Sequence, residues 1–419
     1  MKIMKRALPV LVLCTLLKLS DAVAGNGYFL PGYGAKGQSI GGVGIALPLD
    51  GLSAAVNPAT IGLLDSQLNT GLTILKPERE SEIVGNGIPG FNGQYDGNGK
   101  RYFFLPDVGY INKLSNSTSL GLAIYGNGGL DVTYNDNPFK VFGGSGRAKA
   151  NLSQLFIKPS LAYKLNEHHT IGVGVNFVYQ RFLAEGLQGF SALSVNPDHV
   201  TNKGVSSSVG MGIHLGWIGQ LTNDFSVGAT WSSKISPTRF EKYKGLFADS
   251  GSFDIPATYG VGLAYKATPK LTLAFDFQRI EFGHVSAAAN PLSNLLDGNL
   301  LGSPNGPGFG WKDINVYKVG ASYEVNPNLT LRAGYNHSAG LIPNDQTFFN
   351  VLAPAAIQDH LSVGASWRAS PTGEWSMFYS RALRRQLDGQ NSIPASFGGG
   401  NANILGGTHA LGVAYSWKL

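Results

Sequence analysis

Alternation of large apolar residues with small or polar residues is the feature that most limits the fold of this chain. It is clear in residues 170–180, 271–278, 329–336 and 410–419. One face of each segment is large and apolar, as expected for β-strands with one face in an apolar environment. A soluble sandwich gives the same period, but here aromatic residues fall at strand ends on the apolar face, as in the interfacial girdles of membrane barrels. These aromatic residues are Tyr163, Tyr179, Trp217, Trp231, Tyr265, Tyr323, Trp367 and Trp417.

The spacing of turns extends this interpretation to the whole chain. Six short turn signals each join two alternating segments: residues 114–117, 165–168, 222–224, 268–270, 326–328 and 370–373. Longer polar, Gly-rich stretches separate these hairpins: residues 81–101, 135–150, 185–206, 237–252, 287–310, 341–356 and 387–406. Short turns that alternate with long loops are typical of an outer-membrane barrel, with the turns on the periplasmic side.

Six hairpins plus a first and a last strand predict an all-β, fourteen-stranded antiparallel barrel over residues 65–419. The even number lets both ends of the barrel lie on the periplasmic side. The second strand is interrupted by Pro106, and neither of its faces is clearly apolar. The expected strands begin near Gln67, Tyr102, Ser117, Leu152, Thr170, Ser207, Phe225, Phe253, Leu271, Asp313, Leu329, Gln358, Trp375 and Thr408.

The first 24 residues have the pattern of a secretory signal peptide. Basic residues precede an apolar run, and Ala22-Val23-Ala24 fits a cleavage site after Ala24. The run from Ala7 to Leu17 is too short to span a bilayer, which takes about 20 residues. Removing this segment takes away the sole cysteine and lowers the formal net charge from +6 to +3. The basic charge therefore gives no argument for a nucleic-acid partner, and no disulfide is expected.

Residues 25–64 form a Gly-rich stretch with no clean strand or helix period. Such a run buries too little apolar area to fold alone, yet it is too apolar for a solvated tail. We interpret it as a hatch, or plug, that folds inside the barrel. Asn57-Pro58-Ala59 would form a turn where the hatch leaves the lumen, because Pro58 keeps Asn57 out of the helical region; an ordinary loop turn is the alternative.

These features together resemble the outer-membrane long-chain fatty acid transporter family, FadL, which includes the TodX-type aromatic hydrocarbon channels. The resemblance is carried by the Gly-rich hatch, by Asn57-Pro58-Ala59, by the run from Tyr125 to Leu130, and by Arg332-Ala333-Gly334-Tyr335 with Gln358-Asp359-His360. The chain departs from the family in ending with Leu419, where Phe is usual.

The resemblance implies a monomeric barrel in the outer membrane of a Gram-negative bacterium that takes up hydrophobic molecules. Its ligand would be a long-chain fatty acid or, alternatively, an aromatic or alkane hydrocarbon, captured at the outer loops and released sideways through a kinked third strand. Gly126, Asn127, Gly128 and Gly129 would form that kink, since Gly within a strand marks a bend or bulge; a Gly-rich wall without an opening is the alternative.

Charged residues that face the lumen by alternation are the candidate ligand contacts. Lys158, Lys318 and Arg332 could bind a carboxylate head group, or they could pair with Asp276, Glu324 or the hatch. Phe348 and Phe349 belong to a set of apolar residues in the outer loops, which could line a capture groove or pack the loops together. The other members of this set are Leu292, Leu295, Leu296, Leu300, Leu301, Val351 and Leu352.

Arg381, Arg384 and Arg385 lie near the outer end of a strand, where lipopolysaccharide phosphate is an expected partner and a solvated loop is the alternative. No catalytic residue, metal site or cofactor is expected. His168 and His169 sit in a short turn, and no Ser, His and acid constellation is evident. A lipid hydrolase and an adhesive barrel remain as functions from other classes.

Overall fold

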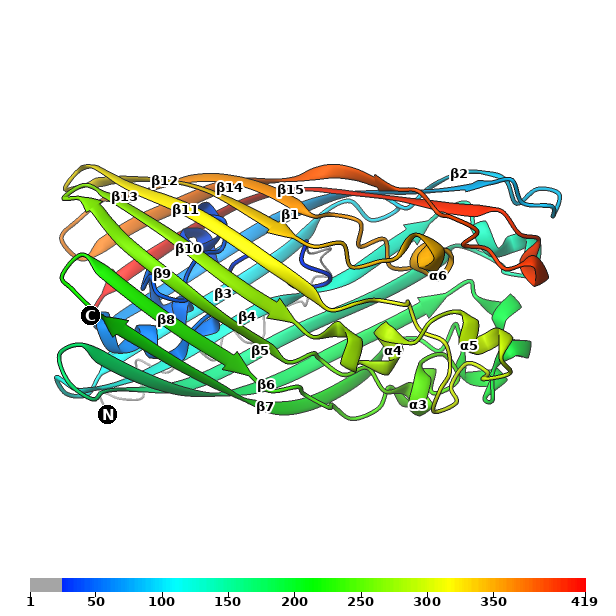
Figure 1. Ribbon diagram of the computed structural model, residues 1–419, viewed down its shortest axis with the longest axis horizontal. Helices are drawn as coiled ribbons and strands as arrows, with labels where there is room; N and C mark the ends of the chain where they lie inside the picture. The colour runs from blue at the N-terminus through cyan, green and yellow to red at the C-terminus, as the bar shows by residue number, and fades with distance from the viewer. Residues whose placement is uncertain (1–24) are drawn as a thin grey trace.

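The computed structural model describes residues 25–419 and is a closed antiparallel β-barrel (Figure 1). The predicted signal peptide, residues 1–24, lies outside the described residues. Each strand pairs with its neighbour in sequence order, and the last strand pairs with the first to close the barrel. Within residues 25–419 no helix is long and apolar enough to cross a membrane.

Fourteen long strands form the barrel, and β2 is a short extra strand on the outer end of β1. The strands are β1 Gln67–Val84, β2 Gly93–Asp96, β3 Phe103–Lys113, β4 Thr118–Tyr134, β5 Ala148–Lys164, β6 His169–Glu185, β7 Ser206–Gln220, β8 Phe225–Ser232, β9 Thr258–Thr268, β10 Leu271–Ile280, β11 Ile314–Asn326, β12 Leu329–Ser338, β13 Asp359–Arg368, β14 Gly373–Leu387 and β15 Asn401–Lys418.

The structure confirms the fourteen-stranded barrel, and the six short turns lie together at the end that holds the C-terminus. Four boundaries were wrong, among them that of β5, which begins at Ala148 rather than at Leu152. β1 and β2 occupy much of the expected loop 81–101, β15 begins seven residues before Thr408, and β9 begins at Thr258 rather than at Phe253. Hydrogen bonds between β1 and β15 continue outward from the apolar band, so polar and Gly residues there remain in strand.

Exposed apolar side chains surround the barrel, as expected for a surface in contact with lipid. Among the aromatic residues singled out from the sequence, Tyr163, Trp231, Tyr265, Tyr323, Trp367 and Trp417 are exposed on this surface. The strands thus carry their large apolar face outward and their small or polar face toward the lumen.

The N-terminal segment, defined here as residues 25–64, is folded inside the lumen toward the short-turn end (Figure 1, blue). It contains α2 Gly34–Ser39 and two short 3-10 helices, η1 Gly51–Ala55 and η2 Pro58–Leu63. Its helices contact strands on opposite sides of the barrel, since α2 packs on β13 and β14 while η2 packs on β5, β6 and β7. The wall therefore supplies the core that this segment lacks by itself.

The long loops fold over the opposite end of the barrel and contain short helices (Figure 1). These are α3 Ala248–Gly251, α4 Ser286–Ala289, α5 Ser293–Leu296 and α6 Thr347–Asn350, with 3-10 turns η3 Pro138–Phe142, η4 Gln188–Leu193, η5 Pro197–His199, η6 Glu241–Tyr243, η7 Phe282–His284, η8 Asn344–Gln346 and η9 Ala395–Phe397. One large apolar cluster joins these loops to Tyr28 and Phe29 of the N-terminal segment.

Candidate functional site

Asn57 ties the N-terminal segment to the wall. Its side-chain amide donates hydrogen bonds to the carbonyls of Ile45 (2.7 Å), Trp217 (3.1 Å) and Ala229 (3.4 Å). Its Oδ1 accepts from the Ala59 N–H at 3.0 Å, which caps η2, and Pro58 occupies the first turn of that helix. The Asn-Pro-Ala turn thus binds one carbonyl of its own segment and two carbonyls of β7 and β8.

Two glycines of the wall leave room for this turn. A Cβ atom at Gly216 of β7 would overlap Asn57 Oδ1, and one at Gly172 of β6 would overlap the backbone of Pro58 and Ala59. Glycine is required at both places because the Asn57 side chain lies against Gly216 and the backbone of Pro58 and Ala59 lies against Gly172.

An inner cavity lies between the N-terminal segment and the wall. Its volume open to the centre of a water molecule is about 60 Å³. Phe29, Tyr33 and Ile45 border it from the N-terminal segment, while Asn127 and other wall residues border it from the strands. Two of the three predicted ligand-binding cations, Lys158 and Lys318, line this cavity together with His214.

Both lysines are buried, and their ammonium groups donate to backbone carbonyls of the N-terminal segment. Lys158 Nζ lies 3.0 Å from the Ala55 carbonyl oxygen and 2.5 Å from His214 Nδ1. Lys318 Nζ lies 2.9 Å from the Pro31 carbonyl oxygen. Within residues 25–419 neither ammonium has a carboxylate within ion-pair distance, 4.0 Å. Lys158 therefore faces the cavity with no carboxylate beside it, whereas Lys318 lies directly opposite the Asp276 carboxylate on the neighbouring strand.

Arg332, the third predicted cation, lies elsewhere. Arg332 lies near the short-turn end of β12, and its Nη1 donates to Ser366 Oγ at 2.6 Å. It borders neither the inner cavity nor a second cavity among the long loops, which is described in the next paragraph. Asp276 also serves the N-terminal segment, because its Oδ2 accepts from the N–H groups of Gly44 (2.8 Å) and Ile45 (3.1 Å). Arg332 is therefore not placed to contact a ligand bound in either cavity.

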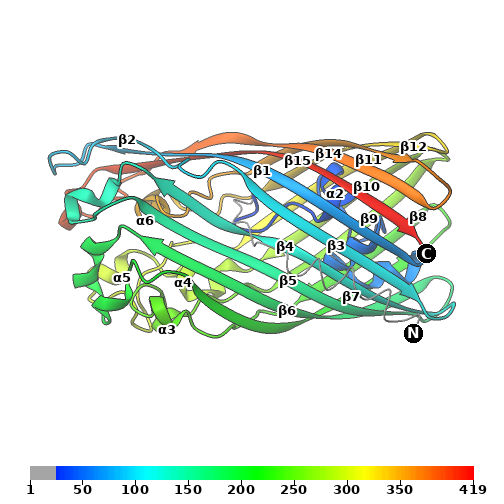
Figure 2. The same ribbon diagram turned by 180° about the vertical axis from the view of Figure 1, so that it is seen from behind.

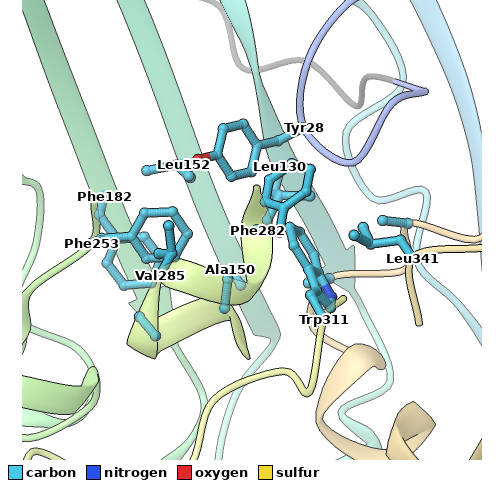
Figure 3. Packing of buried hydrophobic residues seen from close by; sticks show 14 of the residues in the cluster. Tyr28, Leu130, Ala150, Leu152, Phe182, Phe253, Phe282, Val285, Trp311 and Leu341 are labelled. Atoms are coloured by element: carbon cyan, nitrogen blue, oxygen red, sulfur yellow. The ribbon is translucent and has the colours of Figure 1, made fainter. Parts of the chain in front are cut away.

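An outer cavity lies within the large apolar cluster on the side of the long loops, and several of its lining residues, such as Leu152 and Phe182, are labelled in Figure 3. Its volume open to the centre of a water molecule is about 60 Å³, and Asn151 is the single polar side chain among its lining residues. Phe349 lines it, as do Leu301 and Leu352 of the apolar loop residues. Phe348 does not: it is fully buried and packs against other loop aromatics, including Phe397 at 5.5 Å between ring centroids. The loop residues thus divide between lining a cavity and packing the loops.

An aromatic cluster lies beside both cavities, because Phe29 lines the inner one and Phe253, which Tyr28 contacts at 6.0 Å between centroids, lines the outer one. Tyr28 and Phe282 meet edge-to-face at 5.2 Å between centroids, and Phe282 meets Trp311 in the same way at 5.2 Å (Figure 3). Phe29 stacks on Tyr28 at 5.0 Å and reaches the inner cavity. Because Tyr28 and Phe29 belong to the N-terminal segment, a shift of that segment would change the packing beside both cavities.

The wall is discontinuous at the predicted kink. β4 pairs with β3 only between Asp107↔Tyr125 and Lys113↔Ser119, although β3 remains paired with β1 up to Phe103. A bulge interrupts the pairing of β4 with β5 between Gly126 and Gly128, and Gly128 has φ 140°. We call the stretch over which β3 and β4 form no strand pairing, residues 100–106 facing residues 126–132, the seam. Figure 2 shows β1, β3 and β4 at this side of the barrel.

The N-terminal segment supplies hydrogen bonds where β3 does not. The Gly129 N–H donates to the Tyr28 carbonyl at 3.0 Å, and the Leu30 N–H donates to the Asn127 carbonyl at 3.2 Å. Tyr33 donates its hydroxyl to Asn127 Oδ1 at 2.6 Å. Burial raises the pKa of Tyr33 above its ordinary value, so this hydroxyl remains a donor. All four predicted kink residues therefore lie at the seam.

Arg79 and Asp131 were missed in the sequence. Both side chains are fully buried, and Arg79 Nη1 lies 2.8 Å from Asp131 Oδ1 across the outer end of the seam. Alternation along β1 puts Arg79 on the lumen side, and this signal could have identified it.

The outer arginines have protein partners. Arg381 Nη2 lies 3.0 Å from Glu78, Arg384 Nη2 lies 2.9 Å from Glu80, and Arg385 donates to Gln358. Binding of lipopolysaccharide at this place stays a prediction.

Comparison with known proteins agrees with this geometry. The family model described as "Outer membrane protein transport protein (OMPP1/FadL/TodX)" matches residues 19–391. Outer membrane protein P1 of Haemophilus influenzae is 24% identical over 304 residues, which are 62% of this chain and 64% of that relative. The alignment thus spans less than two thirds of the relative's length.

Solved structures share the fold. The toluene transporter TodX of Pseudomonas putida is 20% identical with a TM-score of 0.68, covering 94% of this chain and 100% of that one. A FadL homologue of Pseudomonas aeruginosa is 15% identical with a TM-score of 0.68, covering 94% of this chain and 99% of that one.

Proposed function

The chain belongs to the OMPP1/FadL/TodX family of outer membrane transport proteins, and from this premise we propose that it takes up long-chain fatty acids. The apolar outer cavity would accept the acyl chain of the ligand. The inner cavity would bind its carboxylate.

The observation that carries this proposal is the pair of lysines in the inner cavity. Lys158 and Lys318 are both buried, and within residues 25–419 neither has a carboxylate within 4.0 Å; the carboxylate opposite Lys318, that of Asp276, instead accepts from the N–H groups of Gly44 and Ile45. Buried charges are costly unless they are paired, and a ligand carboxylate would supply the missing anion. The ammonium groups would then exchange backbone carbonyls of Ala55 and Pro31 for the ligand.

We further propose that the ligand leaves sideways through the seam. An apolar molecule gains about 0.8 kcal/mol for each CH₂ kept out of water, so delivery into the membrane is favoured over release into the periplasm. Unpaired backbone in lipid costs several kcal/mol for each group, and the bonds from Tyr28 and Leu30 to β4 relieve this cost while the seam is closed.

A neutral hydrocarbon is the second candidate ligand. The outer cavity is almost entirely apolar, and both lysines already have hydrogen-bond acceptors in the N-terminal segment. The structural neighbour TodX is described as a toluene transporter. Under this alternative the lysines would serve only to hold the N-terminal segment.

Paired binding measurements separate the two candidates. The double variant Lys158→Gln/Lys318→Gln keeps a hydrogen-bond donor at each position and removes both charges. Because a hydrogen bond to a charged group is worth about 1.5–3 kcal/mol, affinity for oleic acid should fall about tenfold for each lysine that binds it. Affinity for oleyl alcohol, which lacks the carboxylate, should change little.

Arg332→Gln is the matched control, because Arg332 borders neither cavity. It should leave the affinity for both ligands unchanged. An equal loss for the acid and the alcohol in the lysine variant would contradict carboxylate binding and favour the neutral ligand.

The hydrolase alternative gains no support from the described residues. Within residues 25–419 no serine hydroxyl is hydrogen bonded to a histidine ring; the ring of His214 contacts Lys158 and Thr230, and that of His337 contacts Asp359.

A further inference from the structure

We propose that Arg79 and Asp131 form a latch that limits how far the seam can open, and that the latch thereby selects slender ligands over wide ones. This inference rests on the sideways exit proposed above. It concerns a different property, namely the girth of the molecule that passes.

The two ends of the seam are closed in different ways. At the inner end, β3 and β4 resume regular pairing at Asp107↔Tyr125. At the outer end, the Thr133 N–H donates to the Gly97 carbonyl at 3.1 Å and the Gly99 N–H donates to the Thr133 carbonyl at 2.9 Å. Between these points the backbones of the two strands are not hydrogen bonded to each other.

Arg79 reaches every element around the outer end. Its guanidinium pairs with the Asp131 carboxylate at 2.8 Å, and it also donates to the carbonyls of Asp131 and Lys100. It lies 5.3 Å from the ring centroid of Phe103, where β3 begins. Asn151 of β5 donates to the second carboxylate oxygen of Asp131 at 2.5 Å. One side chain of β1 thus holds β4, β3 and the connecting segment together.

A second contact strengthens the same link. Ser81 of β1 and Tyr134 of β4 share a hydrogen bond between their hydroxyls at 2.5 Å. All β4 residues from Asn127 to Tyr134 are buried, so the outer half of β4 is covered on both faces. β1 therefore contacts β4 directly at the level where β3, which otherwise lies between them, no longer pairs with β4.

The latch differs in strength from the inner closure. The inner part of the seam is bridged by two main-chain hydrogen bonds from Tyr28 and Leu30, which belong to the N-terminal segment and can leave with it. Arg79 and Asp131 are fully buried charges that stay together, since separating them would leave the Arg79 guanidinium without its carboxylate in a low-dielectric wall. Opening would therefore extend over residues 126–130 of β4, about 16 Å of strand at 3.3 Å per residue. The width of the opening would stay limited, because β1 is paired with β3 and its side chains also bind β4.

A size-selectivity measurement tests the latch. The double variant Arg79→Met/Asp131→Leu replaces the ion pair with apolar side chains, an exchange that buried pairs often tolerate without loss of folding. Two probes are compared: oleic acid and a fatty acid that carries a terminal pyrene ring. Uptake is measured in cells that lack other transporters of this class, at equal surface level of each variant.

We expect the ratio of pyrene-acid uptake to oleic-acid uptake to rise about tenfold in the double variant, which corresponds to a barrier lowered by about 1.4 kcal/mol for the wide probe. Amide hydrogen exchange of residues 126–132 should also become faster. Arg79→Lys keeps the charge pair but cannot reach all the partners of the guanidinium, so its uptake ratio should lie between those of the wild type and the double variant.

Arg279→Met/Asp313→Leu is the matched control. It removes another Arg–Asp ion pair, at 2.9 Å, which is partly exposed and lies away from the seam, and it should leave the ratio unchanged. Barrel folding is checked by the heat-dependent mobility of each variant on gels. If the double variant does not fold, Arg79→Lys decides the question by the same ratio.

The outcomes separate the latch from the function on which it rests. Wild-type uptake of oleic acid no faster than that of cells without the protein would overturn the proposed transport. Normal wild-type uptake with an unchanged ratio in the folded latch variants would overturn the latch alone.

Discussion

Replacing Asn57 with Ala should loosen the N-terminal segment while leaving the barrel intact. The substitution removes the cap of η2, which is worth about 1 kcal/mol. It also removes two well-formed hydrogen bonds, to Ile45 and Trp217, worth about 1 kcal/mol each. The bond to Ala229 is long, at 3.4 Å, and adds little.

The docked state of the segment should therefore lose about 3 kcal/mol relative to an undocked one, which raises the undocked population about 100-fold. Amide hydrogen exchange reports this population directly, because the protected amides of η1 and η2 exchange when the segment opens. We expect protection of residues 51–63 to fall by about two orders of magnitude, whereas the strands keep theirs. Single-channel recordings in planar bilayers should show more frequent brief openings.

Asn166→Ala is the control for this experiment. Asn166 Oδ1 accepts hydrogen bonds from the N–H groups of His168 and His169 in an exposed turn, so its loss also removes an amide cap but touches no part of the N-terminal segment. Unchanged protection of residues 51–63 in Asn57→Ala would refute the conclusion that the Asn-Pro-Ala turn docks the segment.

Three further predictions test the parts of the proposed route. Deleting residues 25–64 behind an intact signal should leave an insertable barrel that conducts small polar solutes, since fourteen strands enclose a lumen that wall side chains cannot fill; conductance equal to wild type would contradict the plug. Valine at Gly128 and Gly129 should cut cellular uptake sharply while surface level and ligand capture persist, because Gly128 has φ 140° and the seam needs this bend; uptake equal to wild type would favour passage past the N-terminal segment. Phe348→Ala should lower the free energy of unfolding of the outer loops by about 3–5 kcal/mol, whereas Phe349→Ala should mainly weaken binding of oleic acid. The opposite result, with Phe349 stabilising the loops and Phe348 binding the ligand, would contradict these assignments.

Much of the barrel could be predicted from the sequence because strand signals are local. The apolar face of each strand and its short turn lie within about twenty residues of each other. The strand starts at Gln67, Phe225, Leu271 and Leu329 match the prediction residue for residue. The outer boundaries were less accurate, as β15 shows, because pairing with β1 keeps glycines such as Gly406 and Gly407 in strand.

For the candidate sites, too, the sequence predicted local features and missed distant ones. Alternation indicated that Lys158, Lys318 and Arg332 face the lumen, but not how far along the barrel each one lies relative to the N-terminal segment. Lys158 and Lys318 reach the inner cavity, whereas Arg332 lies near the short-turn end of its strand. Phe348 and Phe349 are neighbours of one type in one loop, yet one is fully buried and the other lines the outer cavity.

The sequence by itself determined the fourteen strands, their order and the glycines at the kink, since each depends on residues that are close in the chain. The tertiary structure decided which distant segments meet. The bonds of Tyr28 and Leu30 to β4, and the pair that Arg79 of β1 forms with Asp131, join residues some fifty to a hundred positions apart. No local period encodes such contacts, because they exist only once the barrel has closed around the N-terminal segment.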